Sequence, residues 1–288
     1  MSKGTEILAL ISLLDDDDPE VYENVSNKIL SFGLSIIPDL ENAWGESFNP
    51  KLHQRIEELI HQINFRSVYA DLEEWLNDDY ATILEGALIV ARYHFPDFDK
   101  DEFFINFNKV QQKIWLELNQ SFTPLENINI FNQVFYTILG FSGNYNKQAE
   151  ISDFCINHVL ESRKGNSISI GLLYLILAQQ LELPVYGVNL YRHFILAYQK
   201  NFIFDYDEEN FKETIFYLNP MNKGVPFQRR EIQDYLKSMQ VEEKLSFFNP
   251  APPKALIKEL LFYMQYYFVS RNEHDKALEI SQLKDLFN

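Results

Sequence analysis

The spacing of apolar and polar positions changes at Pro184. From Pro19 up to that point, apolar residues recur every three to four positions, the spacing of amphipathic helices. After it come short stretches rich in β-branched and aromatic residues, at 185–190, 193–198, 202–206 and 214–218. From Gly224 the helical spacing returns. The pattern predicts a predominantly helical α+β protein with one small antiparallel sheet.

The segment 168–181 is apolar on nearly all sides, so we expect a buried helix rather than a surface helix. Ser167 stands where this helix should begin, and Asn166 is the expected N-cap. The start of a helix presents free N–H groups and a partial positive charge. A nucleophile placed there is favoured as an anion, and an oxyanion beside it is stabilised.

Several motifs surround this helix. The main ones are Gly165-x-Ser167, Leu172-x-x-Leu175, Leu183-Pro184 and His193-Phe194. Further ones are Gly140-Phe-Ser-Gly143-Asn144, Val159-Leu-Glu161-x-Arg163-x-Gly165, Val188-Asn189-Leu190 and Asn219-Pro220-x-Asn222-x-Gly224. Jointly, over residues 69–288, they resemble the transglutaminase-like core and, more narrowly, the bacterial SirB-type family. The resemblance implies a papain-like core, in which a helix packs on a small antiparallel sheet, followed by tetratricopeptide (TPR)-like helices.

The resemblance also implies a site. Enzymes of this fold place a cysteine at the helix start, a histidine on the following strand, and an Asp or Asn that orients the histidine. The matching positions here are Ser167, His193 and Asn219, and Asp205 is the alternative third member. The resemblance thus predicts that His193 faces the start of the helix and is held by Asn219. A serine in place of the cysteine has a far higher pKa and needs a well-placed base.

Other interpretations of these residues remain open. His193 could be a buried histidine satisfied by a backbone carbonyl. The Gly/Asn-rich turn at 140–146 is either a loop beside the site or a turn that ends a helix. Cys155 is expected to be an inert core thiol, and a catalytic role would require it to face His193.

The spacing, together with the resemblance, predicts three regions. Residues 1–64 read as HEAT-like helix pairs, with start signals at Asp18-Pro19 and Asn49-Pro50 and a stop at Gly33. Residues 65–248 form the transglutaminase-like domain, which begins with helices at 71–76, 80–94, 101–118 and 125–139. Residues 249–288 read as a TPR-like helical hairpin.

Charge and cysteine content limit the classes of partner and the cellular location that we expect. The net charge of −17 argues against nucleic acid and anionic membrane surfaces. We expect a cytoplasmic location. The chain has a single cysteine, no predicted signal peptide and no apolar run long enough to span a bilayer. The sequence has no Cys/His cluster of the kind that binds a metal ion, so neither a metal nor a cofactor is expected. The acidic run at residues 15–18 is interpreted as a solvated turn and helix cap.

Two classes of function follow. We expect a non-catalytic protein-interaction or regulatory module with a degenerate Ser-His-Asn site, whose partner is a protein or peptide. The alternative is an enzyme for acyl transfer or amide hydrolysis that uses Ser167, His193 and Asn219.

Overall fold

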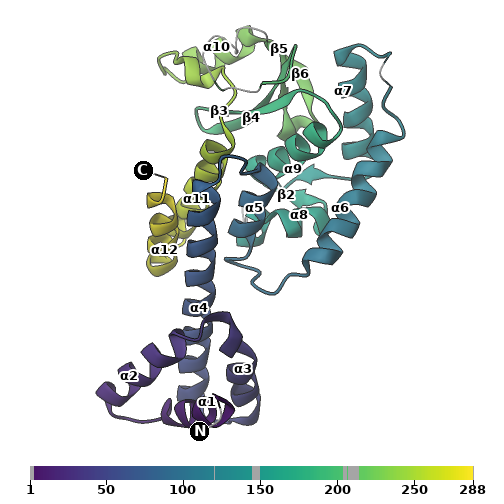
Figure 1. Ribbon diagram of the computed structural model, residues 1–288. Coiled ribbons are helices and arrows are strands. Elements are labelled where there is room, and N and C mark those ends of the chain that lie inside the picture. The colour runs from purple at the N-terminus through teal and green to yellow at the C-terminus, as the bar shows by residue number, and fades with distance from the viewer. Residues whose placement is uncertain (1–2, 120, 145–149, 204–205, 207–213, 288) are drawn as a thin grey trace. The chain divides into compact units, whose positions relative to one another are not determined.

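The computed structural model describes residues 3–119, 121–144, 150–203, 206 and 214–287 (Figure 1). The chain forms two compact units, Met1–Glu74 and Trp75–Asn288. Each unit is described by itself below. Helices predominate in both, as predicted, and both of the small sheets belong to the second unit.

The first unit is built from helices around its own core. Its elements are α1 (Lys3–Leu13), α2 (Pro19–Leu30), the 3-10 helix η1 (Gly33–Ile36), α3 (Ile37–Glu46) and most of α4 (Pro50–Asn77). The predicted start of α2 is confirmed, because Asp18 Oδ1 accepts the Glu20 N–H at 2.9 Å. The apolar faces meet in one core, which includes Leu14, Ile29, Ile36, Leu40, Ile56 and Leu59.

Helix α4 corrects one prediction. A helix at 71–76 was expected to be separate from the one that begins at Pro50, but α4 runs without interruption from Pro50 to Asn77. The physical reason is visible in the sequence, since no Gly or Pro lies between Lys51 and Asn77 to interrupt the backbone hydrogen bonds.

The second unit begins with three capped helices, α5 (Ile83–Ala91), α6 (Lys100–Trp115) and α7 (Pro124–Asn132). Thr82, Asp99 and Thr123 accept backbone N–H groups at their starts. These helices occupy the predicted regions. Helix α7 continues as a π-helix, η2 (Gln133–Ile138), which the periodicity did not reveal.

A short parallel pair of strands leads into the central helix. Strand β1 (Ser142–Gly143) pairs with β2 (Lys164–Gly165). The 3-10 helix η3 (Ile151–Phe154) and helix α8 (Ile156–Ser162) lie between them in the chain. Helix α9 (Ser167–Gln180) follows directly, and its side chains from Ile168 to Ala178 are buried, as its apolar sequence predicts.

The main sheet is antiparallel, with the order β3 (Val185–Leu190), β4 (His193–Gln199), β5 (Thr214–Asn219) and β6 (Val225–Phe227). The predicted strand at 202–206 lies partly outside the described residues, and Phe202 and Ile203 are not in a strand. The fourth strand is instead β6, which the sequence analysis missed. It contains Pro226, a residue that sheets tolerate at an edge.

The two faces of this sheet carry different helices (Figure 1). Successive residues of a strand point to opposite faces. One face of β4, which includes Phe194, meets α9. The other face, which includes Ile195, packs against Ile232 and Leu236 of α10 (Arg229–Ser238). The sheet therefore lies between the central helix and α10.

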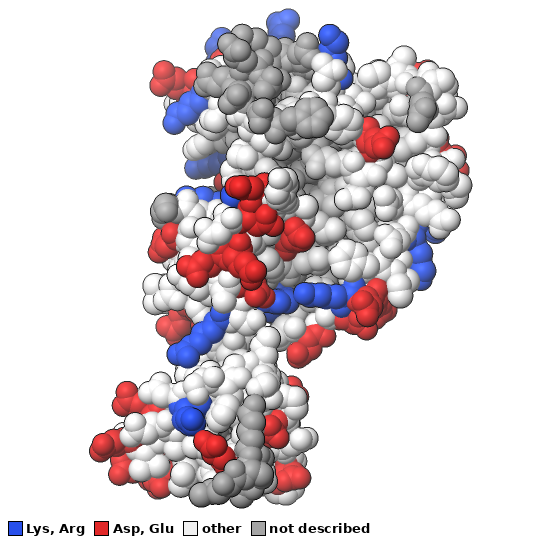
Figure 2. Space-filling model, viewed as in Figure 1, with Lys and Arg blue, Asp and Glu red and all other residues white. Residues whose placement is uncertain are grey.

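The chain ends with the 3-10 helix η6 (Leu245–Phe247) and two packed helices, α11 (Pro253–Ser270) and α12 (His274–Asp285). On the face drawn in Figure 2, acidic side chains are widespread, and Lys and Arg lie near α10 and at several places lower on the same face. No helix of the described ranges is long and apolar enough to cross a membrane.

Candidate functional site

The start of α9 has the predicted cap. Asn166 Oδ1 accepts the N–H groups of Ile168 and Ser169 at 3.1 and 3.0 Å. Ser167 is the first residue of the helix, and its side chain makes no hydrogen bond with another described residue. The position that corresponds to the family's cysteine is therefore held at a well-formed helix start.

Asp153 fastens this start to the preceding chain, a role that the sequence did not suggest. Its side chain is buried, and its Oδ2 accepts the Asn144 amide at 2.9 Å. Its backbone oxygen accepts the Ser169 hydroxyl at 2.6 Å and the Asn166 N–H at 3.3 Å. The buried carboxylate is tolerated because the Asn144 amide and the Glu150 N–H both donate to its Oδ2.

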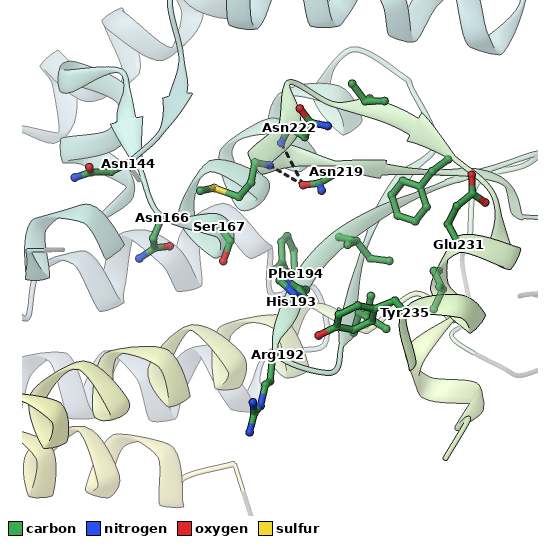
Figure 3. Close-up of a pocket in the computed structure, with 16 residues that line it drawn as sticks. Asn144, Asn166, Ser167, Arg192, His193, Phe194, Asn219, Asn222, Glu231 and Tyr235 are labelled. Carbon is green, nitrogen blue, oxygen red and sulfur yellow. Dashed lines mark hydrogen bonds between the residues drawn. The ribbon is translucent and has the colours of Figure 1, made fainter. Parts of the chain in front are cut away.

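A cavity of about 680 Å³ opens beside the helix start (Figure 3). Its lining includes Ser167, His193 and Asn219, so the structure brings all three predicted site residues to one cavity. Most of the remaining wall is apolar, with Leu190, Ile195, Met221, Val225, Phe227 and Ile232. The volume is in the usual range for a small-molecule or peptide side-chain pocket.

His193 begins β4 and lies on the α10 side of the sheet. It pairs with Leu190, and it shares its face with Ile195, which packs on α10. The ring contacts Tyr235 edge-on, with 5.1 Å between the centroids. Partial burial lowers the pKa of His193 below its ordinary value, because burial disfavours the charged form. The ring is therefore mainly neutral near pH 7.

Phe194, not His193, faces the central helix. A side chain at Gly171 would overlap the Phe194 ring, so the ring lies directly against α9. His193 itself lines the cavity beside the helix start, so its orientation toward Ser167 stays a prediction. The strand places the phenylalanine on the side of α9, because neighbouring residues alternate between faces.

The hydrogen bonds of Asn219 are local. Its Oδ1 accepts the N–H groups of Met221 and Asn222 at 3.0 and 3.2 Å, and so caps the 3-10 helix η5 (Pro220–Asn222). Among the described residues, it makes no hydrogen bond with His193. The alternative third member, Asp205, lies outside the described residues.

Hydrogen bonds from behind hold the turn that follows Asn219. Tyr136 of the π-helix donates its hydroxyl to the Pro220 oxygen at 2.9 Å. The Asn132 amide donates to the Gly224 oxygen at 2.8 Å and accepts the Tyr174 hydroxyl at 2.9 Å. The wall of the cavity that carries Asn219 is therefore fixed by groups outside the predicted triad.

Cys155 is not an alternative nucleophile at this cavity. Its side chain is buried, with the sulfur 3.7 Å from the Ile151 oxygen. Burial raises the pKa of the thiol to about 12, so it remains protonated at neutral pH. A thiol reacts as its thiolate, which is absent under these conditions.

The turn after η2 fits both of its interpretations. Gly140 has a φ of 77°, which suits a residue that ends a helix. A few residues on, Asn144 lines the cavity. Tyr145 and Asn146 lie outside the described residues. Asn144 stands in a motif that the sequence analysis noted without assigning it to the site, and Tyr235, which stands in no motif, was missed.

The described ranges contain no group of three His, Cys, Asp or Glu side chains placed to hold a metal ion. The cavity offers hydrogen-bonding side chains together with apolar ones. Such a cavity can bind an uncharged or acceptor-bearing ligand through direct contacts.

Comparisons with known proteins agree with the fold. A family model described as the transglutaminase-like superfamily matches residues 103–262, which is more than half of the chain. A UPF0162 protein of Xylella fastidiosa is 23% identical over 209 residues, 70% of each chain. Protein SirB1 of Salmonella typhimurium is 20% identical, over 72% of this chain and 74% of that protein. F-box only protein 21 of Mus musculus is 25% identical over 66% of this chain but only 33% of its own length. No solved structure matches the chain at a significant level.

Proposed function

Because this chain belongs to the transglutaminase-like superfamily and has SirB-type relatives, we propose that it is a non-catalytic module of that superfamily. Its cavity binds a segment of a protein or peptide, and the Ser-His-Asn set is a degenerate form of a catalytic site. The observation that carries this proposal is that Ser167, His193 and Asn219 line one cavity without a hydrogen bond among them in the described chain.

The chemistry of serine supports the proposal. A serine hydroxyl stays protonated until a base removes its proton, and a base must come within roughly 2.6–3.2 Å to do so. His193 lies on the far side of its strand from α9, and Phe194 occupies the near side. His193 would have to turn toward Ser167, within the cavity that both residues line, before it could act as the base. Asn219 would also have to give up its cap to orient the ring.

One observation favours the alternative, a serine-based acyltransferase or amide hydrolase. All three residues line the same cavity, and apo sites are often looser than their working form. In that mechanism Ser167 is the nucleophile, His193 the general base, and Asn219 the group that orients the histidine.

An amine-incorporation assay distinguishes the non-catalytic module from the enzyme. It compares the wild type with Ser167→Cys and Ser167→Ala, with a glutamine-containing protein as acyl donor and a labelled primary amine as acceptor. We expect no incorporation by the wild type. Incorporation by Ser167→Cys alone would show that the site geometry persists without its nucleophile. It would support the proposal that the wild type is non-catalytic. Incorporation by the wild type that Ser167→Ala abolishes would overturn the proposal in favour of the enzyme.

The flanking regions are also part of the proposal. We infer HEAT-like helices at 1–64, a transglutaminase-like domain at 65–248 and a TPR-like hairpin at 249–288. The paired helices α11 and α12 support the last of these, since Leu261, Met264, Phe268 and Ala277 are buried. A single hairpin is too short to form a peptide-binding array, so its role is to cover the domain. The acidic chain favours a cytoplasmic protein partner over nucleic acid or membrane.

A further inference from the structure

A second cavity, of about 1060 Å³, lies at the other end of the central helix from Ser167. Helix α9 begins at the first cavity and ends with Gln180, which lines the second. The rest of the second lining comes from α6, α7, the turn after α9 and Tyr198 of β4. The 14 residues of α9, at about 1.5 Å per residue, put roughly 20 Å between its two ends. The two cavities are therefore separate sites.

Carboxamide side chains make up most of the polar part of this second lining. They are Asn108, Gln111, Gln112, Asn119, Asn127 and Gln180. The side chains of Asn108, Gln112 and Gln180 make no hydrogen bond with another described residue. A carboxamide both donates and accepts, so these groups match a ligand whose own polar groups do the same.

The charge of the lining excludes other ligands. Its described residues include no Lys, Arg or His, and Glu182 is their one carboxylate. Phosphates and carboxylates are bound chiefly by cationic side chains, which give the strongest hydrogen bonds to them. An anionic ligand would meet no cation in this lining and would be repelled by Glu182. The cavity therefore suits a neutral ligand.

Trp115 gives the cavity an aromatic surface. Its side chain is 63% exposed, whereas Trp75 of the same unit is buried. Its indole has no hydrogen bond and no ring contact with another described residue. The face of an aromatic ring is electron-rich, so it attracts the C–H groups of a ligand that lies flat on it. The Trp115 ring is open to such a contact.

Tyr198 is held beneath these groups. It is only 6% exposed, yet it lines the cavity. Its ring stacks on Phe216, with 5.0 Å between the centroids. Its hydroxyl makes no hydrogen bond with another described residue. A tyrosine hydroxyl this deep in a protein usually has a partner, and a ligand in the cavity would supply one.

An extended peptide fits this site less well than a sugar does. Peptides are often bound as an added strand at the edge of a sheet. Strand β4, which carries Tyr198, is paired on both sides, by β3 and β5, so it offers no free edge. A sugar ring instead has C–H groups on its faces, which suit Trp115. Around its rim it has hydroxyls that both donate and accept, which suit the carboxamides.

We propose that this second cavity binds a neutral oligosaccharide. One sugar ring stacks on Trp115, and the hydroxyls of the chain hydrogen bond to the carboxamides and to Tyr198. The inference is independent of the function proposed for the first cavity, because it uses none of the residues that line it.

Isothermal titration calorimetry of the full chain tests the proposal with three neutral hexasaccharides, maltohexaose, cellohexaose and chitohexaose. We expect at least one of them to bind with a Kd of about 1 mM or tighter. Hexagalacturonate, an anionic hexasaccharide, should bind at least about tenfold more weakly than the best neutral one. Binding of none of the three neutral sugars, or equal binding of the anionic one, would overturn the proposal.

Two variants place the bound sugar at this cavity. Trp115→Ala should weaken binding at least about tenfold and leave thermal unfolding unchanged, because the side chain is exposed. Tyr198→Phe keeps the ring and removes one hydrogen bond, so it should weaken binding about fivefold. Trp44→Ala is the matched control, since Trp44 is also exposed but belongs to the first unit, outside this lining.

Two results with these probes would contradict the assignment. Binding that Trp115→Ala leaves intact, or that Trp44→Ala weakens equally, would show that the sugar binds elsewhere. A neutral eight-residue peptide of alternating Ser and Ala serves as the competing ligand. If it bound more tightly than every sugar, and lost that binding in Trp115→Ala, the cavity would be a peptide site instead.

Discussion

Two groups of residues at the cavity, one behind its lining and one in it, differ in how they are hydrogen bonded. The layer behind the lining, here called the back wall, consists of Asn132, Tyr136 and Tyr174. These residues do not line the cavity, but they hydrogen bond to one another or to the turn that runs from Pro220 to Gly224. The front consists of Ser167, His193 and Asn219, which have no hydrogen bonds among themselves in the described chain. Tyr174 of the back wall is fully buried, whereas His193 of the front is largely exposed and only one side of its ring is covered, by Tyr235.

This difference means that the stability of the fold does not depend on the residues at the catalytic positions. Buried polar groups must be paired, so the back wall persists as long as the domain folds. The front carries no such requirement, and the residue at the nucleophile position can change without loss of the architecture. A transglutaminase-like domain can therefore keep its cavity after catalysis is no longer selected.

The largest effect is expected from breaking the back wall. Asn132→Ala removes the partner of the buried Tyr174 hydroxyl and of the Gly224 oxygen. Leaving two such groups unsatisfied should lower the free energy of unfolding by about 3 kcal/mol. Urea denaturation followed by circular dichroism measures this loss.

The matched control lies at the front. Asn222→Ala changes the same residue type at an exposed position whose backbone N–H, not its side chain, is used by Asn219. Its stability should stay within about 0.5 kcal/mol of wild type. Similar losses in the two variants would show that back and front do not differ.

An intermediate effect is expected at the start of α9. Asn166→Ala deletes the cap of the central helix and should cost about 1 kcal/mol. Asn166→Asp restores an accepting oxygen and should recover most of that loss. If the aspartate variant were as unstable as the alanine variant, the cap would not be the source of the effect.

The back wall is also the part that the sequence predicted least. The apolar run of α9 and its Asn166 cap follow from local periodicity and local hydrogen bonding, and both were predicted. The three site residues could be brought to one cavity from motif positions alone. Tyr136 reaches Pro220 from a π-helix, and Asn132 reaches Gly224 across 92 positions of the chain. Contacts this distant in sequence leave no periodic signal.

The orientation of His193 could not be derived from the sequence, for a different reason. Strand alternation fixes that His193 and Phe194 point to opposite faces, but the sequence does not say which face meets α9. Gly171 decides it, because only a residue without a side chain leaves room for the Phe194 ring. The meander was likewise predicted with a strand at 202–206, whereas the edge strand is β6.

A smaller effect concerns the protonation of His193. Burial lowers its pKa, so the folded state binds fewer protons than the unfolded state near and below the ordinary histidine value. The stabilisation from the neutral ring is complete above that value, and it is lost as the pH falls toward the lowered pKa. Titration followed by NMR of the ring protons should give a pKa below the ordinary value.

Tyr235→Ala should raise that pKa back toward the ordinary value, because the tyrosine ring covers one edge of the imidazole. An unchanged titration in this variant would assign the burial to other neighbours. Tyr80→Ala is a suitable control, since Tyr80 is 90% exposed and is not part of the cavity lining.

The smallest effect is expected at the nucleophile position itself. The Ser167 side chain makes no hydrogen bond with another described residue, and alanine has a slightly better helix propensity than serine. Ser167→Ala should therefore leave the free energy of unfolding within about 0.5 kcal/mol of wild type, and Ser167→Cys should behave alike. Urea denaturation of both variants measures this. A loss of about 2 kcal/mol or more, the size of an unsatisfied buried partner, would instead mean that the hydroxyl is tied into the structure. Ser167 would then be a structural residue like those of the back wall. A substitution at this position would change both the stability of the domain and the chemistry of the site.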